Sequence, residues 1–126
     1  MTTDTFVPQV GGKHYSGEVQ HWDVMEKYDV DYLLGQGTKY LMRWRVSGKA
    51  RIDLGKSASY LQKAILCRPG QGARRLVPQA ALDELYAACR THHHDTTIIN
   101  RVLASGSHDD LVWALEQVRE MEASAS

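Results

Sequence analysis

Lys39 and Arg43 stand four residues apart in a segment whose apolar residues recur at helical spacing. Residues at this spacing lie one turn apart on one helix face, so the two cations can bind one anion together. Arg43 can form two parallel hydrogen bonds with a phosphate, and Lys39 adds a compact charge. Lys56, on the next segment, is a third such cation. The pattern predicts a phosphate-binding pocket built from these three side chains.

A glycine-containing stretch near the start of the chain supplies further candidates. Gly11 and Gly12 let the backbone approach a ligand closely. The next residues, Lys13, His14 and Tyr15, offer a charge, a titratable donor and a ring for stacking. The alternative for this stretch is a turn with a packed tyrosine.

Aromatic residues alternate with the cations in the first half of the chain. A ring beside a cation suits nucleobase stacking combined with a phosphate contact. Tyr15 and Trp22 are the candidates for stacking on a base. Each ring taken alone is more often part of a core, and we expect Tyr40 and Trp44 to pack at least partly. The aromatic residues considered are Tyr15, Trp22, Tyr40, Trp44 and Tyr60.

The formal net charge of zero conceals an uneven distribution. Between residues 36 and 75 one acid, Asp53, accompanies ten basic residues, whereas the remaining five basic residues are spread among fourteen acids. Such a local excess favours an anionic partner. The alternative is a solvated cationic face, or one that the acidic ends of a neighbouring subunit neutralise. The ten basic residues are Lys39, Arg43, Arg45, Lys49, Arg51, Lys56, Lys63, Arg68, Arg74 and Arg75.

Other patterns are weaker candidates for chemistry. Residues 50–57 loosely fit a Walker A loop, but such a loop follows a buried strand, whereas residues 39–46 are helical in pattern. Consecutive residues on a helix point in different directions, so His92, His93 and His94 indicate a helix end with exposed imidazoles. We therefore predict no metal site.

The cysteines and the overall composition indicate a globular intracellular protein. Cys67 and Cys89 form no CxxC pair, which favours reduced thiols in helices. The chain of 126 residues, 43% hydrophobic and 24% charged, has the size and composition of one domain. No apolar run approaches the roughly 20 residues that a bilayer requires, and residues 1–5 do not resemble a secretory signal. We expect a cytoplasmic protein without a membrane partner.

The apolar periodicity predicts an all-α fold with an extended N-terminal arm. We expect a first helix over residues 19–28, with Trp22 and Met25 facing inward and Val24 as a further candidate for that face. Asp31 caps a second helix, which ends at Ser47 and Gly48. The residues that recur along one face of this helix are Leu33, Gly37, Tyr40 or Leu41, and Trp44.

A third helix is expected from about Asp53. Its buried stripe comprises Leu54, Ala58, Leu61 and Ile65, and its more polar face carries Asp53, Lys56, Tyr60 and Lys63.

After a basic turn at residues 70–78, three short helices are expected. Asp95 caps the second of them and Gly106 stops it, although residues 96–99 could also form a strand. Ser107 opens the last helix with a capping-box pattern.

Four linked motifs resemble those of one family. They are GKHY at 12–15, HWDV at 21–24, LGQGTKYLMR at 34–43 and DLGKSASYL at 53–61. Their order and spacing are similar to the small phage-encoded SaV-like family (DUF3310) over roughly residues 11–66. The typical pattern of that family is HY, a short helix, GxxxKYxxR and DLxKAxxYL. Gly55 and Ser57 stand where the family often has lysine and alanine.

The resemblance implies a bacteriophage nucleotide-binding protein in the cytoplasm of the infected host. The family includes the nucleotide kinase of T7-like phages, which phosphorylates deoxynucleoside monophosphates without a Walker A loop. A kinase would use ATP and Mg²⁺; a protein that only binds would need no cofactor. The residues carried over by motif position are His14, Tyr15, Lys39, Arg43, Asp53, Lys56 and Tyr60, of which Asp53 and His14 are the candidate catalytic residues.

Taken together, the motifs divide the chain into three parts. We expect an arm over residues 1–18, a helical nucleotide-binding core over residues 19–68 and a C-terminal helical extension over residues 69–126. Because a small helical domain with a basic face tends to build its site between subunits, we also expect a homo-oligomer.

Three functions remain open. The first is a nucleoside monophosphate phosphotransferase. The second is a non-catalytic sponge that sequesters cyclic or other nucleotide signals of bacterial anti-phage defence, and the third is a single-stranded nucleic-acid binder. Mg²⁺ requires oxygen ligands, and Asp23 and Asp53 are the only carboxylates in the four motifs. This scarcity favours binding over turnover.

Overall fold

The computed structural model describes residues 19–125, so Lys13, His14 and Tyr15 of the expected arm lie outside the described residues. Within this range the chain is helical and contains no strand, which confirms the all-α prediction. The segments are α1 (His21–Lys27), α2 (Tyr32–Arg43), α3 (Ala50–Cys67), α4 (Gln79–Cys89), α5 (His93–Asn100), the π-helix η2 (Arg101–Ser105) and α6 (His108–Ser124).

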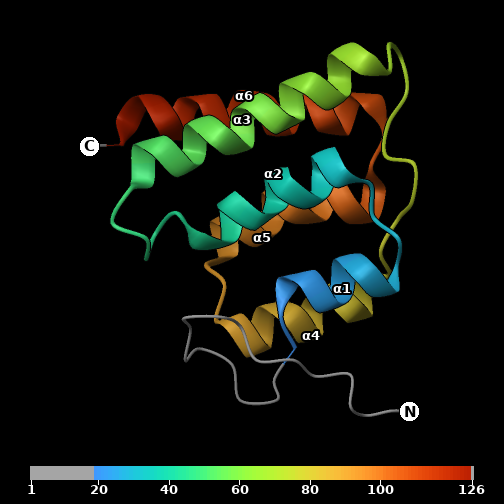
Figure 1. Cartoon of the computed structure of the whole chain (residues 1–126), viewed down its shortest axis with the longest axis horizontal. Coiled ribbons are helices and arrows are strands. Elements are labelled where there is room, and N and C mark those ends of the chain that lie inside the picture. The colour runs from blue at the N-terminus through green and yellow to red at the C-terminus, as the bar shows by residue number, and fades with distance from the viewer. Residues whose placement is uncertain (1–18, 126) are drawn as a thin grey trace.

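The helices form two layers of three (Figure 1). Helices α1, α2 and α3 make one layer, and α4, α5 and α6 lie behind them in the same order. Residues 68–78 connect the two layers. Their apolar side chains meet in one core, whose largest fully buried members are Leu34, Leu41, Leu54, Leu61, Leu82, Leu85, Ile98, Ile99, Leu103 and Leu111.

Local signals set several helix ends where the sequence places them. The Oδ1 atom of Asp31 accepts a hydrogen bond from the Leu34 N–H at 3.1 Å and caps α2. Ser107 and Asp110 form the expected capping box at α6. Gly106, with φ of +60°, ends the π-helix in a conformation that favours glycine.

The expectations about which residues of α1 and α2 are buried are confirmed in part. In α1 Val24 is buried and Met25 packs partly against the core, as expected, but Trp22 is 47% exposed because α1 packs through the opposite face. In α2 the expected Gly37 and Leu41 are buried together with Leu34 and Thr38, whereas Leu33 and Trp44 are half-buried.

The predicted positions of two acidic residues, Asp53 on the polar face of its helix and Asp95 as a helix cap, are also wrong. Helix α3 begins at Ala50, before Asp53, and Asp53 is buried beside α2 and does not lie on the polar face. His92 caps α5 through a hydrogen bond from the His94 N–H to its Nδ1 atom, while Asp95 lies one turn inside and is buried. In both cases a neighbouring arginine contacts the acid, a contact that local sequence does not reveal.

A buried ion pair joins the end of α3 to the start of α2. Arg68 donates two hydrogen bonds to Asp31, of 2.7 and 3.1 Å, and both side chains are buried. Burial alone would raise the pKa of Asp31, but the hydrogen bonds from Arg68 and Leu34 hold it below its ordinary value. The stabilisation is therefore present at neutral pH and is lost as the pH falls through the pKa of the folded state.

We predict that Arg68→Ala lowers the free energy of unfolding by about 3–5 kcal/mol, because it leaves the Asp31 carboxylate buried without its cation. Urea denaturation at neutral pH measures the change. Arg75→Ala is the matched control, since Arg75 forms an exposed 3.6 Å pair with Asp29 and its removal should change stability little. Equal midpoints for the two variants would contradict the prediction.

Candidate functional site

Three cations surround one tyrosine ring at the junction of α2 and α3. The Nζ atoms of Lys39 and Lys56 lie 4.8 and 5.3 Å from the centroid of the Tyr40 ring, and the guanidinium carbon of Arg43 lies 5.6 Å away. We call these four residues the Tyr40 cluster. The structure thus brings together, from two helices, the three side chains that the sequence singles out as phosphate ligands.

A close approach of α2 and α3 makes this arrangement possible. Gly37 has no side chain at the crossing, where an added Cβ atom would lie 3.4 Å from the side chain of Leu61. The hydroxyl of Ser57 donates a hydrogen bond of 2.8 Å to the Gly37 carbonyl. One turn beyond this contact, Tyr40 of α2 comes within reach of Lys56 of α3.

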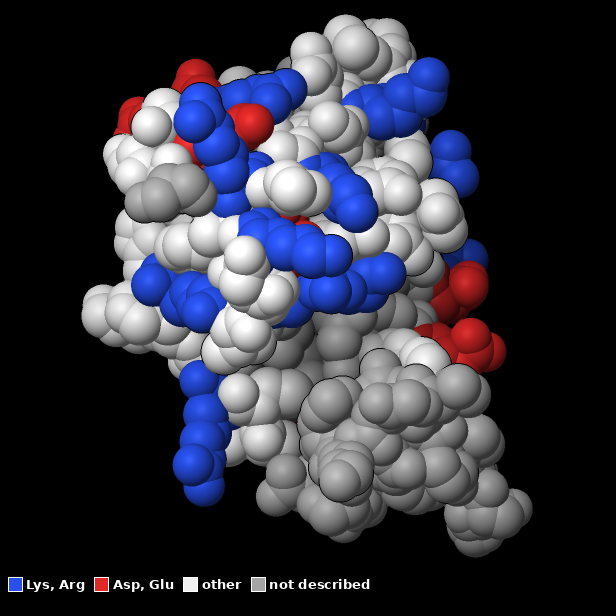
Figure 2. Space-filling model, turned by 60° about the vertical axis from the view of Figure 1, so that its left-hand side comes forward, with Lys and Arg blue, Asp and Glu red and all other residues white. Residues whose placement is uncertain are grey.

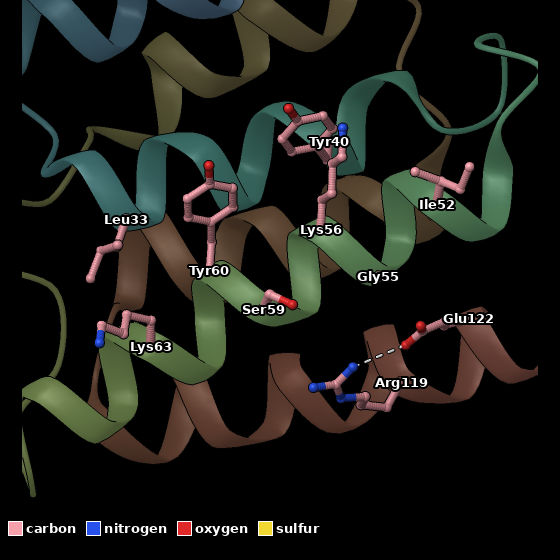
Figure 3. A pocket seen from close by; sticks show the side chains of 10 residues that line it. All are labelled: Leu33, Tyr40, Ile52, Gly55, Lys56, Ser59, Tyr60, Lys63, Arg119 and Glu122. Carbon is pink, nitrogen blue, oxygen red and sulfur yellow. Dashed lines mark hydrogen bonds and ion pairs between the residues drawn. The ribbon is translucent and has the colours of Figure 1, made fainter.

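Tyrosine rings extend the cluster along the same face. Tyr60 is stacked with Tyr40, with ring centroids 6.2 Å apart and an angle of 7° between the planes. Tyr32 meets Tyr60 edge to face, with ring centroids 6.0 Å apart. Figure 3 shows Tyr40, Lys56 and Tyr60 together on this face. Tyr40 and Tyr60 are half-buried, but Tyr32 is 66% exposed.

Asp53 is a supporting residue of the cluster because it is buried beneath it. Its side chain is 3% exposed, and its Oδ2 atom lies 3.6 Å from Nε of Arg43, too far for a hydrogen bond. That oxygen is buried and has no hydrogen-bond partner among the described residues. The buried carboxylate therefore attracts the Arg43 guanidinium, while half of the Arg43 side chain stays exposed to solvent.

A second acid fixes the turn between α2 and α3. Asp95 accepts a 2.7 Å hydrogen bond from Nε of Arg45 and a 3.3 Å hydrogen bond from the Trp44 indole. The Arg45 guanidinium lies over the Trp44 ring at 4.2 Å. These contacts join the turn to the layer behind and hold the C-terminal end of α2 in place.

Basic side chains gather on the face that surrounds the cluster. Figure 2 shows this face, with Lys and Arg side chains spread over it and few acidic side chains among them. It is the left-hand side of Figure 1, where α2 ends and α3 begins. The local excess of positive charge that the sequence shows is therefore also concentrated in space.

Three hollows adjoin the Tyr40 cluster. The Tyr60 groove, of about 660 Å³, runs over α3 past Tyr40, Lys56 and Arg119 (Figure 3). The Trp22 hollow, of about 320 Å³, lies between α1 and α2 and has Lys39 in its wall. The Met42 hollow, of about 530 Å³, is lined by Lys39 and Arg43. A ligand bound at the cluster can therefore extend into a hollow on either side of α2.

His21 lines both the Trp22 and the Met42 hollows. The Thr38 hydroxyl donates its one proton to the Leu34 carbonyl at 2.9 Å. The 2.9 Å contact between Nε2 of His21 and this hydroxyl is therefore a hydrogen bond that the histidine donates. Its Nδ1 atom then carries a lone pair. Burial, together with the charge of Lys39, lowers the pKa of His21 to about 4.

The remaining sequence candidates lie apart from the cluster or have a structural role. Trp22 is exposed beside Lys39 in the Trp22 hollow, and residues 50–57 are helical throughout, so they form no Walker A loop. His92, His93 and His94 are exposed at the start of α5. Among residues 19–125 no group of three His, Cys, Asp or Glu side chains is placed to hold a metal ion.

Sequence reasoning missed Tyr32 and His21. Tyr32 lies seven residues before Lys39, which is two helical turns, so the face shared with the cations was a usable signal. The hydrogen bond between His21 and Thr38 joins two helices and leaves no local pattern in the sequence.

No family model, curated protein or solved structure matches the chain. Membership of the SaV-like family therefore stays a prediction. None of the helices in residues 19–125 has the length and apolar character to cross a membrane.

We predict that His21 titrates with a midpoint of about 4 and is neutral at pH 7. Since the unfolded chain takes up this proton near its ordinary value of 6.5, the contribution to stability is present above pH 6.5 and is lost as the pH falls from 6.5 to about 4. Proton–carbon NMR of the imidazole measures the midpoint, and His21→Gln should remove this part of the pH dependence. A midpoint near 6.5 would show the prediction to be wrong.

Proposed function

We propose that this protein binds a phosphorylated nucleoside, with the phosphate held by the Tyr40 cluster. The observation that carries the proposal is the convergence of Lys39, Arg43 and Lys56 around one ring. With Asp53 beneath Arg43, the group has a formal charge of plus two. A phosphate monoester at neutral pH carries a charge of comparable size and opposite sign, and guanidinium and ammonium groups are its usual ligands.

The base has to lie outside the cluster. The Tyr40 ring already contacts three cations and Tyr60, so it has little surface left for a nucleobase. Trp22 and Tyr32 are 47% and 66% exposed and line a hollow that Lys39 also lines. An exposed ring beside a cation suits a base attached to a bound phosphate. The proposal therefore assigns base contact to these rings.

The chemistry of the site favours binding over phosphoryl transfer. A kinase would hold Mg²⁺–ATP through exposed carboxylate oxygens. Asp53, the carboxylate next to the cluster, is buried beside Arg43, and Glu122 in the Tyr60 groove accepts a hydrogen bond from Arg119 at 3.1 Å. The acids next to the cluster are therefore engaged by arginines, and Glu26 of the Trp22 hollow is the one exposed, unengaged carboxylate among the described residues that line the three hollows. This supports a sponge that retains a nucleotide unchanged, such as a cyclic signal of anti-phage defence.

We also propose that the protein forms a homo-oligomer through the basic face. Val46 and Ile52 are 86% and 57% exposed at the two sides of the turn between α2 and α3, beside the Tyr40 cluster. Light scattering on the full chain should give at least twice the mass of 14.2 kDa, and Val46→Glu should lower it, because a buried charge destabilises an apolar contact. A monomer that binds nucleotide would contradict this.

We predict that Lys39→Ala, Arg43→Ala and Lys56→Ala each weaken binding of a nucleoside monophosphate by about tenfold or more, since each removes a charged hydrogen-bond donor. Isothermal titration calorimetry with the matching nucleoside as second ligand measures the phosphate contribution. Arg75→Ala is the matched control, because Arg75 is exposed, forms a 3.6 Å pair with Asp29 and lines none of the three hollows. Unchanged affinity in all three variants would overturn the proposal.

Assays on the same wild-type and variant proteins distinguish the three candidate functions, namely kinase, sponge and single-strand binder. After incubation with ATP, Mg²⁺ and each deoxynucleoside monophosphate, we expect the nucleotides to be recovered unchanged. Diphosphate products that disappear in Lys39→Ala would instead indicate the kinase. Affinity that rises with oligonucleotide length and falls steeply with salt would indicate a single-strand binder.

A further inference from the structure

The Trp22 hollow has the shape and lining of a base-binding site. Its volume of about 320 Å³ is at the lower end of the range for small-ligand sites, about 300–1,000 Å³. Trp22 of α1 and Tyr32 of α2 line it, and both rings are exposed. Met25 and Val30 add half-buried apolar surface. A flat aromatic ligand can therefore be covered by side chains from both helices.

The hollow opens beside the proposed phosphate position. Lys39 belongs to its wall and also contacts the Tyr40 ring, which joins it to Arg43 and Lys56. A nucleotide whose phosphate is held by the Tyr40 cluster can thus place its base in the Trp22 hollow without crossing a buried element. Because Lys39 belongs to both, the Trp22 hollow is continuous with the proposed phosphate site and is not an isolated surface depression.

Glu26 is the carboxylate of the hollow that remains available. It lies four residues after Trp22, so the two side chains share one face of α1. Glu26 has no ion pair and no hydrogen bond to another described side chain, whereas Asp31, the other acid in the wall, is bound by Arg68 and caps α2. An ionised carboxylate offers two oxygens that only accept hydrogen bonds.

The Watson–Crick edges of the bases differ in how well they can form hydrogen bonds with a carboxylate. Guanine presents two adjacent donors, the ring N1–H and the exocyclic amine, which match the two oxygens of a carboxylate. Adenine and cytosine place a ring nitrogen lone pair beside their amine, so one oxygen would face a lone pair. In uracil and thymine the N3–H lies between two carbonyl oxygens. A carboxylate at this edge therefore favours guanine and disfavours the others.

We propose that the Trp22 hollow recognises guanine and that Glu26 is the residue that determines this preference. This inference rests on the nucleotide-binding function proposed above and adds the identity of the base. A second polar side chain in the wall, Gln36, offers an amide donor that suits the guanine O6 carbonyl. The ligand class is thus a guanine nucleotide.

Calorimetry on the full chain with GMP, IMP, AMP, CMP and UMP tests the inference. We expect GMP to bind about tenfold or more tightly than AMP, CMP and UMP, because a site built to pair two donors leaves its acceptors unpaired with the other bases. IMP, which lacks the exocyclic amine but keeps the N1–H, should bind with intermediate affinity.

The variant Glu26→Gln should lower the affinity for GMP to that for AMP while the dependence of AMP binding on Lys39 persists. Glu116→Gln is the matched control, since Glu116 is an exposed acid on α6 that lines none of the three hollows. Circular dichroism and thermal unfolding of both variants establish that the fold is retained.

Several outcomes would overturn the inference, and they differ from failure of the proposed function. Equal affinity of the wild-type chain for all five nucleotides would reject guanine recognition and leave nucleotide binding intact. A preference for GMP that survives Glu26→Gln would reject the role of Glu26. If none of the five bound, the phosphate-binding function would fail and guanine recognition with it.

Discussion

The close approach of α2 and α3 at Gly37 and Ser57 is the constraint on which the candidate site depends. A Cβ atom added at Gly37 would make only ordinary van der Waals contact with Leu61, at 3.4 Å, so the glycine permits the approach and the Ser57 side chain holds it. The Ser57 hydroxyl donates a 2.8 Å hydrogen bond to the Gly37 carbonyl, which joins the two helices at this point. Wider spacing would move Lys56 away from Tyr40, and the three cations would no longer share one ring.

Two buried carboxylates hold arginine side chains of the basic face in position. Asp53 lies beneath Arg43, and Asp95 holds Arg45 together with the Trp44 indole. Both carboxylates are 3% exposed, so each contributes charge to a neighbouring arginine without offering its oxygens to solvent. The same placement explains why a basic face can persist in a chain of zero net charge, and why the described acids near the cluster are poor ligands for a metal ion.

In the two-layer architecture, the residues that stabilise the fold and the residues of the candidate site are different ones. The apolar core lies between the layers, and the buried pair of Arg68 and Asp31 closes the end of the front layer. The opposite end of that layer carries the joining turn and the Tyr40 cluster, and the Trp22 hollow extends from Lys39 back to Asp31 at the start of α2. Because the site is built from the outer faces of α1, α2 and α3, its side chains can change without emptying the core. A neutral His21 between two hollows adds an acceptor beside Lys39, which suits recognition of hydroxyl or amine donors on a ligand.

The helical class of the chain, the caps at Asp31 and Ser107, the stop at Gly106 and the shared face of Lys39 and Arg43 follow from the sequence alone. Each depends on residues within about one or two turns of each other, where backbone geometry dictates the neighbours. The burial of Asp53, the outward position of Trp22, the stacking of Tyr40 with Tyr60 and the bond between His21 and Thr38 were decided by the tertiary structure. These features depend on which faces of separate helices meet, and that is set by the summed packing of the core, to which no local pattern corresponds.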